Sequence, residues 1–210
     1  MALVIHVREI VVPGEAVADR PVRMHNTYID GGKTYAATVG LFDREHNEII
    51  PLEGGWVPHI EDVVVGIVKT SKNSVYEIDL SYFKRSILIA SKFERHPLKV
   101  GEAIEASIKD IEDRKTIILY RERVLNGGTM MEVKASKVPR IIGKNSTMVN
   151  QISELTGASI TVGRNGIVWL RGGNVELAAE AILKIENEAH IKGLTERIRM
   201  MLEDRTRKGE

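Results

Sequence analysis

The side chains that most often perform catalysis are scattered along this chain of 210 residues. The six histidines are dispersed, and none belongs to a His-Glu-x-x-His pattern or a comparable set of metal ligands. Two pairs of neighbouring carboxylates, Glu61-Asp62 and Glu112-Asp113, could in principle hold Mg²⁺ for a nuclease. Adjacent residues of a strand point to opposite faces, however, so each pair would be split. The sequence therefore offers no pattern of catalytic or metal-binding residues, and we expect neither enzymatic activity nor a metal or cofactor.

Composition narrows the class of protein further. The chain has no cysteine, which excludes disulfide scaffolds and thiolate metal sites such as zinc ribbons. Its 43% hydrophobic and 28% charged residues are ordinary for a globular protein that can bury compact cores. No apolar run approaches the roughly 18 residues that span a bilayer, and the opening apolar run is too short for a signal peptide. We therefore expect a cytoplasmic protein without a membrane partner.

Charge is distributed unevenly although the net charge is only +1. Lys plus Arg against Asp plus Glu number 5 and 8 in residues 1–53, 12 and 11 in residues 54–128, and 13 and 10 in residues 129–210. The segment charges are therefore −3, +1 and +3. Because phosphates favour a basic surface, the later segments are better suited than the first to contact a nucleic acid.

The first segment, residues 1–53, is predicted to consist of short strands joined by turns. In residues 1–53, a strand is expected from Glu9 to Val12, and Gly31-Gly32 predicts the turn of a hairpin leading into Thr34 to Val39. Ile49 to Leu52 would be an edge strand, because Pro51 cannot donate to a ladder. No helical pattern is present here.

Five further strands are expected between residues 54 and 124. They are separated by polar turns within about seventy residues, a pattern typical of a small closed barrel, most naturally an OB fold. The expected strands are Val63 to Val68, Val75 to Leu80, Ser86 to Ile89, Ala103 to Ile111 and Thr116 to Tyr120.

Helices enter the pattern after residue 128. The turn-rich segment 125–129 predicts a domain boundary, and a third domain would span residues 129–210 in the order strand, helix, helix, strand, strand, helix. Its strands are expected at Met130 to Val133, Ser159 to Val162 and Ile167 to Arg171, and Asn174 would cap the helix that follows. A further amphipathic helix is expected from Thr195 to Arg205.

The segment between the two predicted helices, Ile141 to Ser146, resembles the signature of a KH domain. In that family a Gly-x-x-Gly loop brings backbone amides close to the sugar-phosphate chain, beside an apolar groove for single-stranded bases. The resemblance implies RNA contacts by Ile142, Gly143, Lys144, Asn145 and Ser146. Serine stands in place of the second glycine, and as an N-cap it would occupy amide donors. The alternatives are thus an RNA-binding loop and a structural KH domain with a weakened site.

The middle segment resembles the S-one-type OB module, through Glu61 to Val68 and through Lys99 to Ala103. Such modules bind single strands by stacking bases on exposed aromatics beside basic residues. The candidates are Tyr76, Tyr82, Phe83, Lys84, Arg85, Arg114 and Lys115. Tyr76 and Phe83 could instead belong to the barrel core, because alternation places half of the strand residues inside.

The first segment resembles the N-terminal domain of exosome RNA-binding cap subunits, through Arg8 to Glu15, Gly31 to Gly40 and Ile50 to Leu52. With OB and KH modules following in that order, nearly the whole chain resembles the KH-containing cap subunit of the archaeal exosome. The fold class is then multi-domain, mainly β followed by α+β, with an N-terminal β-hairpin domain, a five-stranded OB barrel and a type I KH domain.

This resemblance implies a non-catalytic subunit of a 3′-to-5′ RNA-degrading complex. Residues 1–53 would dock on a hexameric ring of RNase PH-like subunits, residues 54–124 would surround the entry pore, and residues 129–210 would capture single-stranded RNA. The expected ring contacts are Val12, Pro13, Gly14, Tyr35 and Pro51, and other cap subunits would be neighbours. The alternative is a free-standing transcription or translation factor that binds RNA through the same OB and KH modules.

Overall fold

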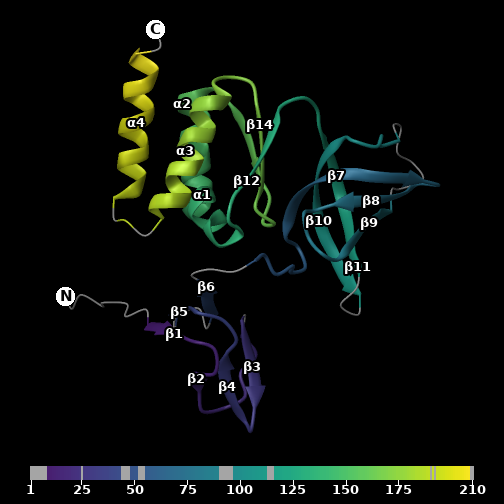
Figure 1. Cartoon of the computed structure of the whole chain (residues 1–210), viewed down its shortest axis with the longest axis vertical. Helices are drawn as coiled ribbons and strands as arrows, with labels where there is room; N and C mark the ends of the chain where they lie inside the picture. The colour runs from purple at the N-terminus through teal and green to yellow at the C-terminus, as the bar shows by residue number, and fades with distance from the viewer. Residues whose placement is uncertain are drawn as a thin grey trace. The chain divides into compact units, whose positions relative to one another are not determined.

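The computed structural model describes residues 9–24, 26–43, 48–51, 55–89, 97–112, 116–189, 191 and 193–208. The chain divides into two compact units, residues 1–55 and residues 56–210, and each is described by itself (Figure 1). Within the described ranges, no helix is both long enough and apolar enough to span a bilayer.

The first unit contains two small antiparallel sheets and, in its described residues, no helix. One sheet has the order β1 (Glu9–Val11), β5 (Gly40–Asp43), β6 (Glu48–Pro51), and the other β2 (Ala16–Ala18), β4 (Lys33–Ala36), β3 (Thr27–Asp30). The predicted hairpin is confirmed, since Gly31 and Gly32 both have positive φ between β3 and β4. The strand ending in Pro51 lies at a sheet edge, as the missing amide hydrogen requires.

A closed five-stranded barrel begins the second unit. Its strands are β7 (Val63–Lys72), β8 (Val75–Asp79), β9 (Arg85–Ile89), β10 (Ala103–Glu112) and β11 (Thr116–Leu125). The order around the barrel is β10-β11-β9-β8-β7, and β7 pairs with β10 to close it. Alternate residues such as Ile104, Ile108, Ile117 and Leu119 point inward and fill the core. The predicted OB-type barrel is confirmed.

The C-terminal part has the strand and helix order predicted for a type I KH domain. Its elements are β12 (Thr129–Glu132), α1 (Val138–Ile142), α2 (Thr147–Thr156), β13 (Ser159–Val162), β14 (Ile167–Arg171) and α3 (Val175–Glu188). The antiparallel sheet has the order β12-β14-β13. The Asn174 side chain caps α3, because its Oδ1 accepts a hydrogen bond of 2.9 Å from the Leu177 amide.

A fourth helix, α4 (Leu194–Lys208), packs on α2 and α3 (Figure 1). It buries Ile198 and Leu202 completely in the same core as Val168 of the sheet. The amphipathic helix expected from Thr195 to Arg205 is thus present and slightly longer, and it adds a second helical layer to this domain.

Both faces of β14 are buried. Val168 and Leu170 face the helices, whereas Ile167 and Trp169 pack with Val65 and Leu125 of the barrel. The alternating sequence of this strand predicted that only one of its two faces would be buried. The second face is covered because the barrel and the KH sheet meet there, within one compact unit.

Asn165, in the turn between β13 and β14, joins the two domains by three hydrogen bonds. Its Oδ1 accepts from the Val65 amide at 3.1 Å, and its Nδ2 donates to the carbonyls of Val65 at 2.8 Å and Leu80 at 3.0 Å. The backbone amide of Arg164 also donates to the Val63 carbonyl at 2.8 Å. The turn therefore acts as the polar part of the joint between barrel and KH domain.

Candidate nucleic-acid interface

The loop from Gly143 to Ser146 connects α1 to α2 and exposes Lys144, Asn145 and Ser146. Gly143 has φ 75° and ψ 171°, and a Cβ there would lie 2.8 Å from the backbone nitrogen of Met148. Only glycine fits this close approach of the loop to the start of α2. Ile142 is half-buried against the helical core and so fixes the loop from the other side.

Ser146 does not cap α2. It lies in the left-handed region with φ 61° and ψ 17°, and its side chain makes no capping hydrogen bond. A capping residue normally has extended backbone, so this conformation turns the hydroxyl away from the first-turn amides. The prediction that Ser146 occupies these donors is therefore wrong. The hydroxyl that bonds locally belongs to Thr147, which donates to the Lys144 carbonyl at 2.8 Å.

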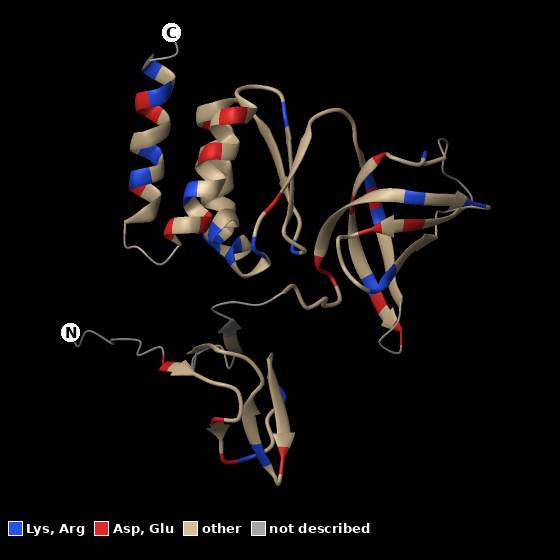
Figure 2. Cartoon of the chain, viewed as in Figure 1, with Lys and Arg blue, Asp and Glu red and all other residues tan. Residues whose placement is uncertain are grey.

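The chain around this loop is basic without any acidic residue. Residues 133–153 contain four cations, Lys134, Lys137, Arg140 and Lys144, and neither Asp nor Glu. Figure 2 shows Lys and Arg on α1 at one end of the helical layer, where the end of α3 also carries acidic residues, and both signs over the barrel and α4. The segment 133–153 itself, with four cations and no carboxylate, is the stretch best suited to contact a polyanion.

Tyr76 lies in the barrel core with only 3% of its surface exposed. Its hydroxyl accepts a hydrogen bond of 3.3 Å from the amide of Leu98. Because β8 alternates, Tyr76 points inward together with Ile78. The prediction that Tyr76 contacts RNA is wrong, since a buried ring offers no face for a base.

Phe83, in contrast, is 83% exposed. The centroid of its ring lies 4.4 Å from the centroid of the Tyr82 ring. The Tyr82 ring in turn contacts Trp56 edge-on, with the two centroids 5.1 Å apart. The Lys84 Nζ lies 5.8 Å from the Phe83 ring centroid. This aromatic series beside a lysine has the composition of a stacking platform for single-stranded bases.

The remaining basic candidates of the barrel differ in their surroundings. Arg85 is exposed and lies 3.6 Å from a carboxylate oxygen of Glu77. An exposed pair of this kind is weak and leaves the guanidinium available to other anions. Arg114 and Lys115 lie outside the described residues.

The predicted ring-docking residues lie around one turn and one strand pair of the first unit. Val12 is 51% exposed, and the Gly14 amide donates to the Ala36 carbonyl at 2.9 Å, which fixes the turn that contains Pro13. Tyr35 stacks on Tyr28 with ring centroids 5.5 Å apart. Pro51 ends the edge strand β6. Their role in docking stays a prediction.

The first carboxylate pair takes part in structural hydrogen bonds. Asp62 accepts from Trp56 Nε1 at 3.1 Å and from the His59 amide at 3.0 Å. Glu61 accepts from the Tyr120 hydroxyl at 2.6 Å, and this bond raises the pKa of Tyr120 above its usual range. In the described part of the chain, no group of three or more acidic or histidine residues could hold a metal ion.

Asn165 is the residue that the sequence analysis missed. The segment Arg164-Asn165-Gly166 reads as an ordinary turn between two strands, and Asn-Gly is common in such turns. Its partners lie 85 to 100 residues away in the chain, so no local pattern reveals them.

Comparison with known proteins matches both ends of the chain to families. Residues 8–53 match the family described as the exosome RNA-binding protein RRP4 N-terminal domain, and residues 128–187 match the KH domain family. A solved structure described as an exosome complex RNA-binding protein aligns with a TM-score of 0.64 and 27% identity, over 75% of this chain and 100% of that one.

Curated archaeal relatives extend the similarity over nearly the whole chain. Exosome complex component Rrp4 of Pyrococcus furiosus is 37% identical over 93% of this chain and 83% of the relative. The component of the same name from Saccharolobus solfataricus is 35% identical over 97% of this chain and 91% of the relative. With the sheets, barrel and KH domain in this order, the chain belongs to the Rrp4 family of exosome complex components.

Proposed function

We propose that this chain is an RNA-binding cap subunit of a cytoplasmic exosome, a complex that degrades RNA from its 3′ end. The observation that carries the proposal is the Gly143–Ser146 loop, which exposes Lys144 in a segment of four cations and no acidic residue. The Phe83 platform on the barrel supplies a second contact, because an exposed ring stacks on bases of any sequence.

In this function the first unit docks and the second unit receives RNA. Residues 1–53 would bind the hexameric ring of RNase PH-like subunits, beside other cap subunits. Their net charge of −3 suits a protein partner better than a polyanion. The barrel and KH domain would guide a single strand into the pore, and cleavage would take place in the ring.

The docking step is tested by measuring the mass of the complex formed with a reconstituted RNase PH-like hexamer. We expect the full chain to bind the hexamer, whereas a truncation that lacks residues 1–53 should remain free. Circular dichroism of the truncation controls for loss of folding. If the folded full chain never associates with the ring, the chain acts as a free RNA-binding factor and the docking role is rejected.

The RNA step is tested by Lys144→Ala. We expect affinity for single-stranded RNA to fall about equally for all sequences, and the slope of log affinity against log salt to decrease by about 1, because one phosphate contact is lost. Since Lys144 is exposed, folding should not change. An unchanged slope would show that Lys144 does not contact a phosphate.

A further inference from the structure

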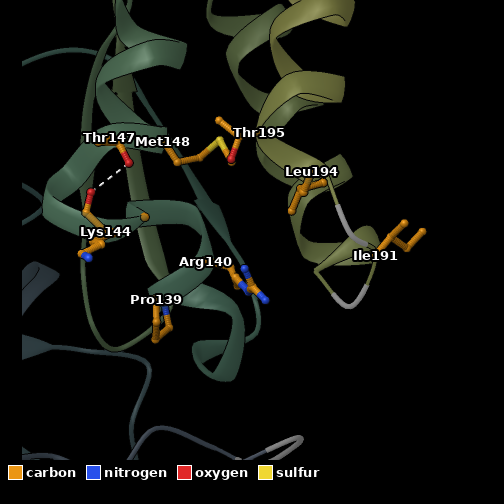
Figure 3. A pocket seen from close by; sticks show the side chains of 10 residues that line it. Pro139, Arg140, Lys144, Thr147, Met148, Ile191, Leu194 and Thr195 are labelled. Carbon is orange, nitrogen blue, oxygen red and sulfur yellow. Dashed lines mark hydrogen bonds between the residues drawn. The ribbon is translucent and has the colours of Figure 1, made fainter. Parts of the chain in front are cut away.

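A pocket of 530 Å³ opens between the KH loop and the corner that joins α3 to α4 (Figure 3). Its volume falls in the range of roughly 300–1,000 Å³ typical of sites for small ligands. One wall comes from α1, the loop and the start of α2, and the other from the chain that enters α4. The lining residues are Pro139, Arg140, Gly143, Lys144, Thr147, Met148, Ile191, Gly193, Leu194 and Thr195.

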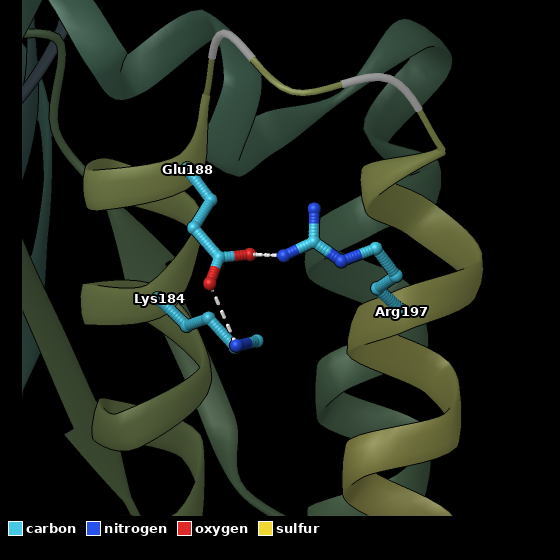
Figure 4. Close-up of polar contacts among 3 residues, drawn as sticks. All are labelled: Lys184, Glu188 and Arg197. Carbon is cyan, nitrogen blue, oxygen red and sulfur yellow. Dashed lines mark hydrogen bonds and ion pairs between the residues drawn. The ribbon is translucent and has the colours of Figure 1, made fainter.

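The wall formed by α4 is held in place by polar contacts with α3. Glu188, near the end of α3, pairs with Lys184 at 2.7 Å through one carboxylate oxygen and with Arg197 of α4 through the other (Figure 4). The Ile191 amide also donates to the Glu188 carbonyl at 2.9 Å. Leu194 is buried in the core at the base of the pocket. These contacts fix the first turns of α4 against the end of α3.

The lining combines cations with an apolar floor. Arg140 and Lys144 lie on the same wall, and within the described part of the chain neither pairs with a carboxylate. Ile191, which is 42% exposed, supplies the accessible apolar surface above the buried side chains of Met148 and Leu194. The hydroxyls of Thr147 and Thr195 lie at the helix starts (Figure 3). A ligand with a phosphate, a polar sugar and a flat apolar ring matches this set of groups.

We propose that this pocket binds one nucleotide of single-stranded RNA, with its phosphate against Arg140 and Lys144 and its base against the exposed side chain of Ile191. The proposal rests on the RNA-binding function proposed above and assigns part of that function to the α3–α4 corner. The KH family match ends at residue 187, so the second wall of the pocket is an addition to the KH domain. The strand thereby contacts the loop on the side that faces α4.

Thr195→Glu tests the pocket without disturbing the core, because Thr195 is exposed in the first turn of α4. An acidic residue at this position suits the helix dipole, so the helix should keep its stability. Met200→Glu adds the same charge to the same helix at a position that is 59% exposed and outside the pocket lining, and it serves as the matched control.

The experiment measures fluorescence anisotropy of the full chain with a labelled oligoadenylate about ten nucleotides long, a length within OB-fold site sizes. We expect Thr195→Glu to weaken binding about three- to ten-fold at low salt, because the new carboxylate repels the phosphate, and the difference should shrink as salt rises. Met200→Glu should bind within about two-fold of the unmodified chain, since its charge lies away from the pocket.

Crosslinking supplies a readout that does not depend on charge. An oligonucleotide that carries 4-thiouridine should crosslink to the peptide containing Met148 or to the one containing Ile191 when irradiated with the full chain. Crosslinks that reach the KH domain only through β13 would overturn the proposal.

Two further outcomes would distinguish failure of the pocket assignment from failure of the proposed RNA-binding function. If Thr195→Glu binds as tightly as Met200→Glu while Lys144→Ala weakens binding, RNA contacts the loop from elsewhere and the pocket assignment is rejected. If the unmodified chain fails to bind the oligonucleotide, the RNA-binding function itself is rejected together with the pocket.

Discussion

Replacing Asn165 with alanine should loosen the joint between barrel and KH domain. The substitution removes three hydrogen bonds, to the Val65 amide, the Val65 carbonyl and the Leu80 carbonyl. Each such bond contributes about 0.5–1.5 kcal/mol net, and a buried group left without a partner costs about 1–3 kcal/mol. Val65 is fully buried, so water cannot easily replace the lost partner. We expect Asn165→Ala to lower the free energy of unfolding of the second unit by about 3 kcal/mol.

Urea denaturation followed by tryptophan fluorescence measures this change. Both tryptophans lie in the second unit, and Trp169 belongs to the joint itself, where its Nε1 donates to the Gly127 carbonyl at 2.7 Å. Its emission should therefore report the loss of the interface directly. An accompanying change in the dependence of stability on urea would indicate that barrel and KH domain no longer unfold together.

Asn165→Asp separates hydrogen bonding from side-chain volume. Aspartate keeps an acceptor for the Val65 amide, but its second oxygen would face two carbonyl oxygens where the amide nitrogen donates. We expect this variant to be at least as unstable as Asn165→Ala at neutral pH. The reasoning fails if Asn165→Ala stays within about 0.5 kcal/mol of the unmodified chain, the usual range for surface substitutions.

Three further outcomes are expected. Asn174→Ala removes the cap of α3 and should lower stability by about 1 kcal/mol in the same urea assay, because only one hydrogen bond is lost. Phe83→Ala should leave stability unchanged but weaken binding of single-stranded RNA by about 1–3 kcal/mol in an anisotropy titration, and equal affinity would remove Phe83 from the interface. The hydrogen bond to Glu61 raises the pKa of Tyr120 above 10.0, so the folded state favours neutral tyrosine. The resulting stability is present below pH 10 and lost as pH rises through the folded pKa, and Tyr120→Phe should remove a late component from the ultraviolet titration of tyrosinate.

The elements of the fold were predictable wherever a local rule decides the structure. Ser159–Val162 and Ile167–Arg171 have the bounds expected from their alternation, and Gly31-Gly32 forms the expected hairpin turn. Asn174 caps α3 because an asparagine directly before an apolar helical stripe favours a side-chain hydrogen bond with a first-turn amide, here that of Leu177. In each case the decisive interaction lies within a few residues of the chain.

The candidate site was less predictable, because its properties depend on conformations and contacts that sequence spacing does not fix. Alternation could not decide whether Tyr76 or its neighbours face the barrel core, since a shift of one residue reverses every side chain. Ser146 has the residue type of an N-cap, but two consecutive left-handed residues, Asn145 and Ser146, turn its hydroxyl away from α2. The pocket requires α4, which reaches the KH loop only through tertiary packing.

The joint at Asn165 also bears on how the two proposed RNA contacts, at Phe83 and Lys144, would act together. A single base on Phe83 and a single phosphate at Lys144 would each be weak, since both groups are exposed to water. A long flexible linker between them would lower the effective concentration of the second contact. Here Trp169 and Asn165 hold barrel and KH domain in one compact unit, so a strand bound at one contact meets the other at a high effective concentration. If both proposed contacts bind RNA, this joint would let them act together although the KH loop lacks its second glycine.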